Sequence, residues 1–217
     1  MNIHGTTIVS RMIAGGEAAF KNFYALSGGL WLNHAPEYIL NSAAIFGLVG
    51  TRAITAGFEV NRYKTLVAAG AVKRGPRPKD VRLNGKFDAV IYRRDGGTPR
   101  CVIEAKTDIW NLGNAQFNLD FASLIYAVTA KNGGTIDFSA FLFYANVDNP
   151  KNGNYCNAAD RLKKLIEGIK QRAETAVSND SLLAHMQHGN IFETDNLGAW
   201  CVGCVVFLPK SKERDFG

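Results

Sequence analysis

The sequence predicts an α/β fold in which a mixed central β-sheet is flanked by helices within a single domain. Segments with apolar residues at helical spacing alternate along the chain with short, strand-like apolar segments, a pattern typical of α/β proteins. The chain has 217 residues, of which 47% are hydrophobic and 20% charged, so it can bury one sizeable core. No internal repeat, low-complexity tract or linker-like segment divides it. We therefore expect one domain over residues 1–217.

Helical spacing and a hairpin signal set the elements expected before residue 110. Pro36 suits the first turn of a helix, and apolar residues follow at positions 39, 40, 43, 46 and 48, which predicts a helix over residues 36–50. Asp95-Gly96-Gly97 has the chemistry of a tight turn between two strands. The expected strands cover residues 57–63, 86–93 and 100–106.

Helices and apolar strands also alternate in the second half. Phe117, Phe121 and Leu124 recur at helical spacing within residues 114–130, which predicts a helix there. The near-continuous apolar run of residues 137–147 predicts a strand buried on both faces. We further expect a basic amphipathic helix over residues 158–177, a helix end and turn at residues 185–190 that holds His185 and His188, and a last strand over residues 199–210.

Two ionisable residues stand out in the strand-like segment CVIEAKTDIW, residues 101–110. Glu104 and Lys106 are two positions apart, so they share one face of the expected strand. If the hairpin pivots near Gly96 and Gly97, Asp88 on the preceding strand lies roughly opposite Ala105. That position is diagonally between Glu104 and Lys106 and within reach of both. We therefore expect these three ionisable groups to meet.

Two neighbouring carboxylates and a lysine are suited to metal-assisted hydrolysis of a phosphodiester. The carboxylates repel each other, and each is costly to desolvate without a partner. Mg²⁺ removes that conflict, because it takes one or two carboxylates and completes its octahedron with water and substrate phosphate. Lysine can orient or deprotonate the attacking water and offset charge in the transition state. The alternative is a cross-strand ion cluster that contributes about 0 to 1 kcal/mol per pair.

The same residues carry a resemblance to a known family. The segment Phe-Asp88-Ala-Val-Ile, the hairpin after it, and Ile-Glu104-Ala-Lys106 resemble the PD-(D/E)xK nuclease superfamily, which has the restriction-endonuclease-like fold. An amphipathic helix follows the motif, as in the family. The resemblance covers about residues 36–146, and residues 158–208 would extend this core. Phe87 stands where the family pattern has proline, a replacement that the family commonly tolerates.

The resemblance implies a Mg²⁺-dependent endonuclease acting on DNA, with Mn²⁺ as a substitute. It implies metal ligation by Asp88 and Glu104, a catalytic role for Lys106 and a supporting role for Glu37 on an N-terminal helix. An acid in a first turn is also favoured by the helix dipole, so Glu37 has a structural alternative, and Glu59 is a weaker substitute for it. The family often places a polar residue on the following helix near the metal or the substrate backbone. Gln116 occupies that place here, and Asp120 shares its helix face one turn later.

The charge balance favours a polyanionic partner. The net charge is +6, and the segment KRGPRPK holds four cations in seven residues just before the strand of Asp88. Either this segment contacts nucleic acid or it is a solvated basic loop. The residues that we predict to contact nucleic acid here are Lys73, Arg74, Arg77 and Lys79.

The biological setting stays open at the sequence level. RNA is an open alternative to DNA, because such a metal site does not sense the 2′-hydroxyl. A homodimer is the simplest route to duplex cleavage, since one site cuts one strand. Restriction, phage conflict, repair and recombination are equally compatible settings. A different class of function is a regulatory or nucleic-acid-binding protein that keeps the nuclease-like fold without cutting.

The sequence gives less support to a membrane protein, a secreted disulfide-rich protein or a zinc-binding protein. No apolar stretch approaches the roughly 20 residues that cross a bilayer, and the first residues do not resemble a secretory signal. Four cysteines in a chain of this length do not resemble a disulfide framework, so we expect a cytoplasmic protein. Cys201 and Cys204 have a zinc-like spacing, but their apolar context favours buried core thiols.

Overall fold

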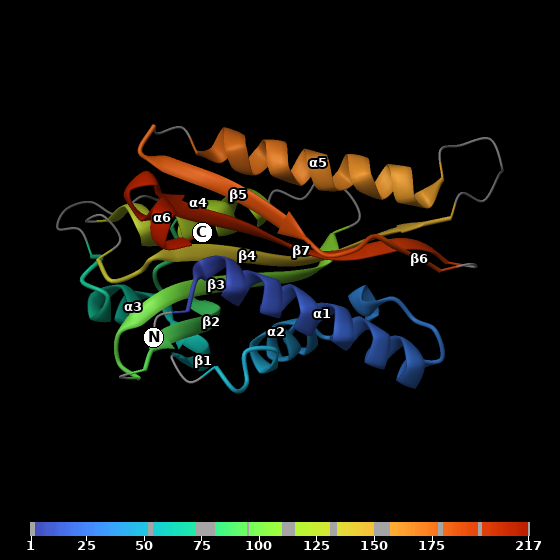
Figure 1. Ribbon diagram of the computed structural model, residues 1–217, viewed down its shortest axis with the longest axis horizontal. Helices are drawn as coiled ribbons and strands as arrows, with labels where there is room; N and C mark the ends of the chain where they lie inside the picture. Colours follow the sequence, from blue (N-terminus) through green and yellow to red (C-terminus); the bar gives the residue numbers. More distant parts are fainter. Residues whose placement is uncertain are drawn as a thin grey trace.

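The structure is a computed structural model that describes residues 3–51, 54–72, 81–94, 96–109, 116–130, 134–149, 157–177, 180–194 and 197–216. Within these residues the chain forms one mixed β-sheet with helices on both faces, the α/β architecture expected from the sequence (Figure 1). The seven described strands are β1 (Ile54–Asn61), β2 (Lys86–Arg93), β3 (Pro99–Ile109), β4 (Phe138–Asp148), β5 (Leu182–His188), β6 (Phe192–Thr194) and β7 (Gly198–Pro209). The described α-helices are α1 (Gly5–Ser27), α2 (Tyr38–Phe46), α3 (Arg62–Ala68), α4 (Gln116–Thr129), α5 (Ala158–Ala176) and α6 (Glu213–Phe216).

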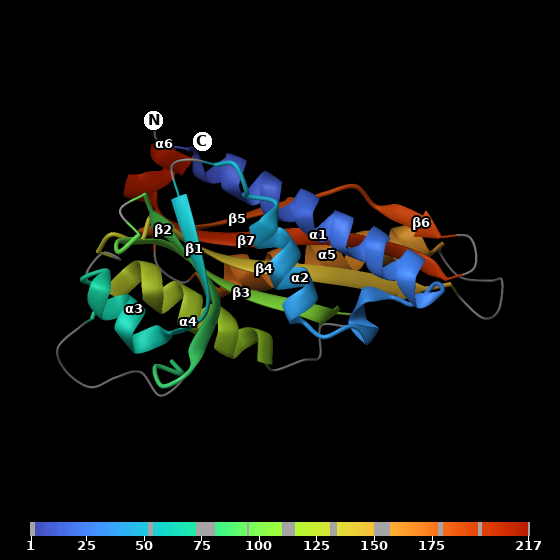
Figure 2. The same ribbon diagram turned by 90° about the horizontal axis from the view of Figure 1, so that it is seen from below.

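The sheet is mixed because one strand pair runs parallel. The strand order is β1-β2-β3-β4-β7-β5, and the short β6 pairs with the first residues of β7. β3 and β4 are parallel, whereas the other paired strands are antiparallel. A parallel pair needs a crossover connection, and α4 lies between β3 and β4 in the chain. Figure 2 shows β1 at one edge of the sheet, and α3, which directly follows β1 in the chain, contacts it.

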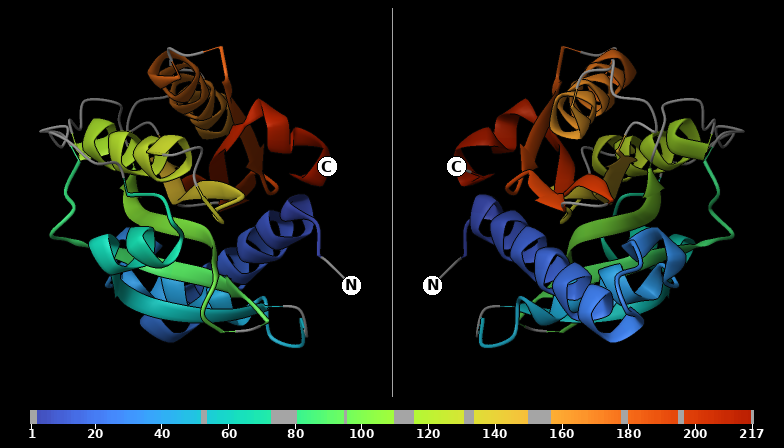
Figure 3. Two further views of the ribbon diagram at one scale, coloured as in Figure 1. Left: turned by 90° about the vertical axis from the view of Figure 1, so that its left-hand side faces the viewer. Right: turned by 90° about the vertical axis from the view of Figure 1, so that its right-hand side faces the viewer.

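Two hydrophobic clusters lie on opposite faces of the sheet. Helices α1 and α2 cover one face, where Leu40 is buried in the same cluster as Ile103 of β3. Helices α4 and α5 cover the other face, where Phe121 is buried in the same cluster as Val102. Figure 3 shows these two helix layers on either side of the sheet. No helix among the described residues is both long and apolar enough to cross a membrane.

The local structure differs from the expectations in three places. Helix α1 lay outside the expected elements, although its buried residues Ile8, Met12 and Ile13 recur at helical spacing. Strand β1 ends at Asn61 rather than at residue 63, because the Asn61 side chain accepts a hydrogen bond from Lys64 N (2.9 Å) and caps α3. The expected helix end at residues 185–190 is wrong, since the segment Leu182–His188 pairs with β7 as strand β5.

The register of the β2–β3 hairpin also differs from the expected one. Arg93 N donates to Thr98 O (2.9 Å), so the chain turns before the expected pivot at Gly96 and Gly97. A register shift next to Ile91, typical of a β-bulge, follows, and Ala89 then faces Ile103. Extending this ladder places Asp88 level with Glu104, not opposite Ala105. The observed pairing itself ends at Ala89 and Ile103, and beyond it Asp88 contacts β3 through its side chain, at the backbone N–H of Ala105.

Candidate functional site

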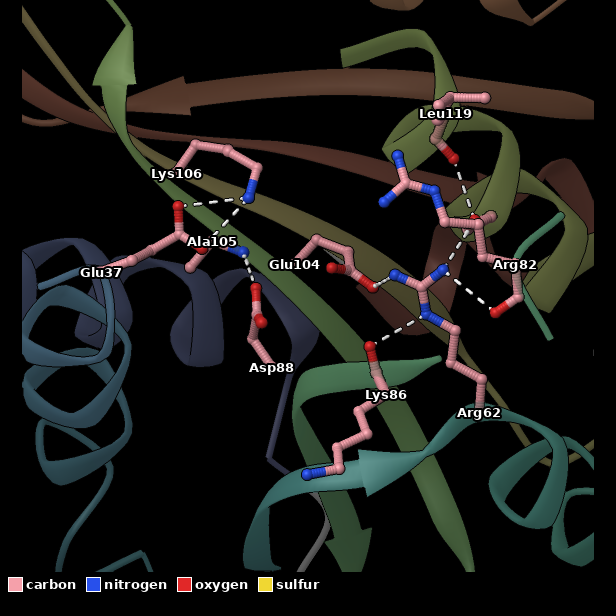
Figure 4. Close-up of polar contacts among 10 residues, drawn as sticks. Glu37, Arg62, Arg82, Lys86, Asp88, Glu104, Ala105, Lys106 and Leu119 are labelled. Carbon is pink, nitrogen blue, oxygen red and sulfur yellow. Dashed lines mark hydrogen bonds and ion pairs between the residues drawn. The ribbon is translucent and has the colours of Figure 1, made fainter. Parts of the chain in front are cut away.

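The acidic residues and the lysine singled out in the sequence lie where β2 and β3 separate. The backbone pairing of the two strands ends at Ala89 and Ile103, and the strands diverge toward Lys86 and Lys106. Helix α2 approaches this gap from one side, and α3 and α4 approach it from the other (Figure 4). The site is therefore built where a ladder stops and leaves backbone groups for side chains to bind.

Asp88 replaces the missing ladder contact with its side chain. Its Oδ2 accepts a hydrogen bond from the backbone N–H of Ala105 (2.7 Å), the residue between Glu104 and Lys106. The Asp88 backbone carbonyl accepts a bond from Asn41 Nδ2 on α2 (2.8 Å). Burial raises the pKa of Asp88 and outweighs the Ala105 N–H and the Lys106 charge, which both act to lower it. Asp88 is thus fixed between the two other motif residues.

Glu104 is buried and bound to a buried arginine. The Arg62 Nη2 atom lies 2.5 Å from Glu104 Oε1, and the two side chains are 5% and 4% exposed. Desolvation raises the pKa of Glu104 to about 8; attraction to Arg62 lowers it, and repulsion from Asp88 and Asp120 raises it further. In Figure 4 the second oxygen of the Glu104 carboxylate points away from Arg62, toward the side where Asp88 and Lys106 lie. The contact with Arg62 thus involves one of the two carboxylate oxygens, Oε1.

Arg62 is held rigidly by several backbone and side-chain acceptors. Its Nε donates to Lys86 O (3.0 Å), and its Nη1 donates to Arg82 O (3.3 Å) and to Ser123 Oγ on α4 (3.2 Å). The guanidinium also lies over the ring of Phe87, with Cζ 5.3 Å from the ring centroid. These contacts make Arg62 a fixed part of the site that orients Glu104. Sequence pattern did not single out Arg62, because the expected strand over residues 57–63 included it.

Lys106 and Glu37 form the third contact of the site. Lys106 Nζ donates to both oxygens of Glu37, at 3.1 and 3.2 Å. Glu37 stands at the N-terminus of α2 but makes no side-chain hydrogen bond to the helix, so its contact with Lys106 is more specific than the helix-dipole alternative. Burial acts to lower the pKa of Lys106, but the charges of Glu37, Asp120 and Asp88 outweigh it and leave this pKa raised. Lys106 is therefore a cation at neutral pH.

Burial also governs the two remaining acids. Desolvation raises the pKa of Glu37, against the Lys106 charge and hydrogen bond that lower it. Desolvation likewise raises the pKa of Asp120, which the charges of Lys106, Arg82 and Arg62 act to lower. Asp120 is 2% exposed, and its Oδ2 has no hydrogen-bond partner among the described residues. An aspartate within the apolar stripe of Phe117, Phe121 and Leu124 was a sequence signal for this residue.

Several other predicted residues are not brought to this site. Lys73, Arg74, Arg77 and Lys79 lie outside the described residues, as does the side chain of Gln116 in the first turn of α4. Glu59 does not take the place of Glu37, because it is exposed and pairs with Lys86 (3.5 Å).

Asp88 and Glu104 have the oxygen ligands that a magnesium ion takes, although no described group of side chains encloses an ion. Among the described residues, no group of three or more His, Cys, Asp and Glu side chains is arranged to hold a metal ion. Mg²⁺ does not need one, because it binds through one or two carboxylates and keeps several waters. The unpartnered Asp120 Oδ2 indicates that a hydrogen-bond donor is missing from the buried side of the site. Asp88 and Glu104 are the residues that would hold the ion.

The alternative zinc pair is not supported. Cys201 and Cys204 are both buried on β7, but they belong to the clusters on opposite faces of the sheet. Burial raises the pKa of the Cys201 thiol to about 12, so it stays protonated. Both side chains are core thiols, as their apolar context predicted.

Comparison of the chain with models of protein families, with curated proteins and with solved structures finds no significant match.

Proposed function

We propose that the protein is a metal-dependent endonuclease that hydrolyses phosphodiester bonds in DNA, with a restriction-endonuclease-like core of the PD-(D/E)xK type. One observation carries this proposal. The carboxylate of Asp88 binds the backbone between Glu104 and Lys106, while Lys106 binds Glu37. All four residues that the family resemblance assigned to the site thus gather at one place, although Glu37 directly precedes α2 and the other three lie on β2 and β3.

Each residue has a defined part in this proposal. Asp88 and Glu104 would hold Mg²⁺, which when bound would lower the pKa of its water and offset negative charge on the phosphate. Lys106 is protonated, so it acts as a hydrogen-bond donor that orients the attacking water or the scissile phosphate rather than as a base. Glu37 fixes the ammonium group of Lys106 through two hydrogen bonds. Arg62 orients the Glu104 carboxylate.

A second candidate is a nucleic-acid-binding or regulatory protein that keeps this fold without cutting. The observation that favours it is the buried Arg62–Glu104 pair, in which a fixed cation already compensates the charge of one proposed metal ligand. The net charge of +6 supports a polyanionic partner under both candidates. RNA remains the alternative substrate for the same site.

A cleavage assay separates the candidates. Supercoiled and linear duplex DNA, single-stranded DNA and single-stranded RNA are incubated with the protein and Mg²⁺ or Mn²⁺, and chelated samples serve as blanks. We expect cation-dependent cutting that falls at least about 100-fold in Asp88→Asn and in Lys106→Met. Asp160→Asn and Lys163→Met remove similar charges from the exposed face of α5 and should cut normally. Nucleic-acid binding without cutting of any substrate would support the second candidate instead.

A further inference from the structure

Asp120 of α4 has a buried carboxylate oxygen that nothing in the described structure satisfies. The residue is 2% exposed, and Oδ2 lacks a hydrogen-bond partner among the described residues. Buried polar side-chain atoms are in most cases hydrogen-bonded, so such an atom marks the place of a missing donor. A carboxylate oxygen without a donor is also costly to bury. An apolar side chain at this position would stabilise the core more than aspartate does, unless Asp120 binds a hydrogen-bond donor in another state of the protein.

The carboxylate of Asp120 faces the candidate site. Its charge acts on Glu104 and on Asp88, and it also acts on Lys106. The same helix face reaches the site again at Ser123, whose hydroxyl accepts a hydrogen bond from Arg62. Figure 4 shows this part of α4, near Leu119, next to the Arg62–Glu104 contact. Asp120 is therefore an acid of the site and not an isolated core residue.

We propose that Asp120 is a positioning residue of the cation site, where it accepts a hydrogen bond from a water bound to the ion held by Asp88 and Glu104. This inference rests on the proposed function. Two facts indicate that Asp120 contacts a water bound to the ion and not the ion itself. Among the described residues, no three acidic side chains are arranged to hold an ion together. In addition, Mg²⁺ keeps several of its waters when it binds to a protein. Groups of this outer kind typically contribute about 10- to 100-fold to metal affinity or activity.

This role predicts two effects of opposite sign for Asp120→Asn. Without a cation, the Asp120 carboxylate repels Asp88 and Glu104 and lacks a donor, so its replacement by a neutral amide should leave thermal stability unchanged or raise it. With a cation, the acceptor for the bound water is weakened, so cation affinity should fall. A purely structural carboxylate would give a loss of stability without a cation.

The experiment is a calorimetric titration of Mn²⁺ into the full chain without nucleic acid, combined with thermal unfolding in EDTA. We expect Asp120→Asn to bind Mn²⁺ about 10- to 100-fold more weakly than wild type, with an unfolding temperature in EDTA equal to or above that of wild type. Glu167→Gln on the exposed face of α5 makes the same charge change and should bind Mn²⁺ normally. Asp120→Ser provides a second variant with the same expected pair of effects.

The outcomes separate this inference from the function on which it rests. Unchanged Mn²⁺ affinity in both Asp120 variants, with loss of binding in Asp88→Asn and Glu104→Gln, would overturn the inference alone. A lower unfolding temperature in EDTA for both Asp120 variants would also overturn it, because it would assign Asp120 to the core. Wild-type protein that binds no Mn²⁺ would remove the proposed cation site and this inference together.

Discussion

Lys106 of β3 and Glu37 at the start of α2 are 69 positions apart in the chain, yet Lys106 Nζ donates to both oxygens of the Glu37 carboxylate at 3.1 and 3.2 Å. This contact joins a helix to the strand that carries the motif glutamate. It also explains why Lys106 keeps a raised pKa in spite of its burial. The lysine is thereby fixed as a cation next to Asp88 and Glu104.

The first prediction concerns Glu37→Gln. The pair with Lys106 is partly exposed, so its loss should cost about 1 kcal/mol of unfolding free energy or less. DNA cleavage should fall much more, by up to about 100-fold, because Lys106 is then free to leave its orientation. Urea unfolding and single-turnover cleavage measure the two effects. Equal cleavage by the variant and the wild type would contradict the role given to Glu37.

The second prediction concerns the buried Arg62–Glu104 pair. Above pH 8, where Glu104 is ionised, Arg62→Met should destabilise the metal-free protein by about 3 to 5 kcal/mol, because the Glu104 charge would remain buried without its cation. Lys86→Met is a matched control, since it removes a cation from the exposed pair with Glu59 and should cost about 0 to 1 kcal/mol. Urea unfolding in EDTA compares the variants. Similar losses of unfolding free energy in Arg62→Met and Lys86→Met would show that Arg62 does not compensate a buried charge.

The third prediction follows from the raised pKa of Glu104. The carboxyl has a pKa of about 8 in the folded protein and 4.5 as its ordinary value, so the folded state binds this proton more tightly than the unfolded state does. The resulting stabilisation is complete below pH 4.5 and is lost as the pH rises through about 8. Across that window the unfolding free energy of wild type should fall relative to Glu104→Gln, by up to about 1.4 kcal/mol per pH unit. Unfolding in EDTA over this pH range tests it, and parallel curves for the two proteins would refute it.

The sequence was sufficient for those parts of the fold that depend on local pattern. Alternation predicted that Glu104 and Lys106 share a face, and the helical spacing of Phe117, Phe121 and Leu124 predicted α4. The strand β5 was mistaken for a helix end because its segment is only seven residues long and becomes a strand through pairing with β7. Short segments of this kind obtain their structure from tertiary contacts.

The parts of the site that the sequence did not predict depend on long-range geometry. The register of the hairpin is set by an early turn and a bulge, which move Asp88 from the level of Ala105 to that of Glu104. Arg62 reaches Glu104 across 42 positions, from the start of a helix that had not been expected. Asp120 was noticed only as a neighbour of Gln116, although its place in the apolar stripe of α4 was a local signal of its burial. Local sequence pattern determines neither the register of the hairpin nor the contact between Arg62 and Glu104.

The central claim is that Asp88 and Glu104 hold a divalent cation beside Lys106, and its most direct test is anomalous diffraction from crystals of the protein soaked in Mn²⁺. We expect an anomalous peak between the carboxylates of Asp88 and Glu104, which disappears in crystals of Asp88→Asn. A fully soaked crystal with no peak at these carboxylates, and with Glu104 bound only to Arg62, would contradict it.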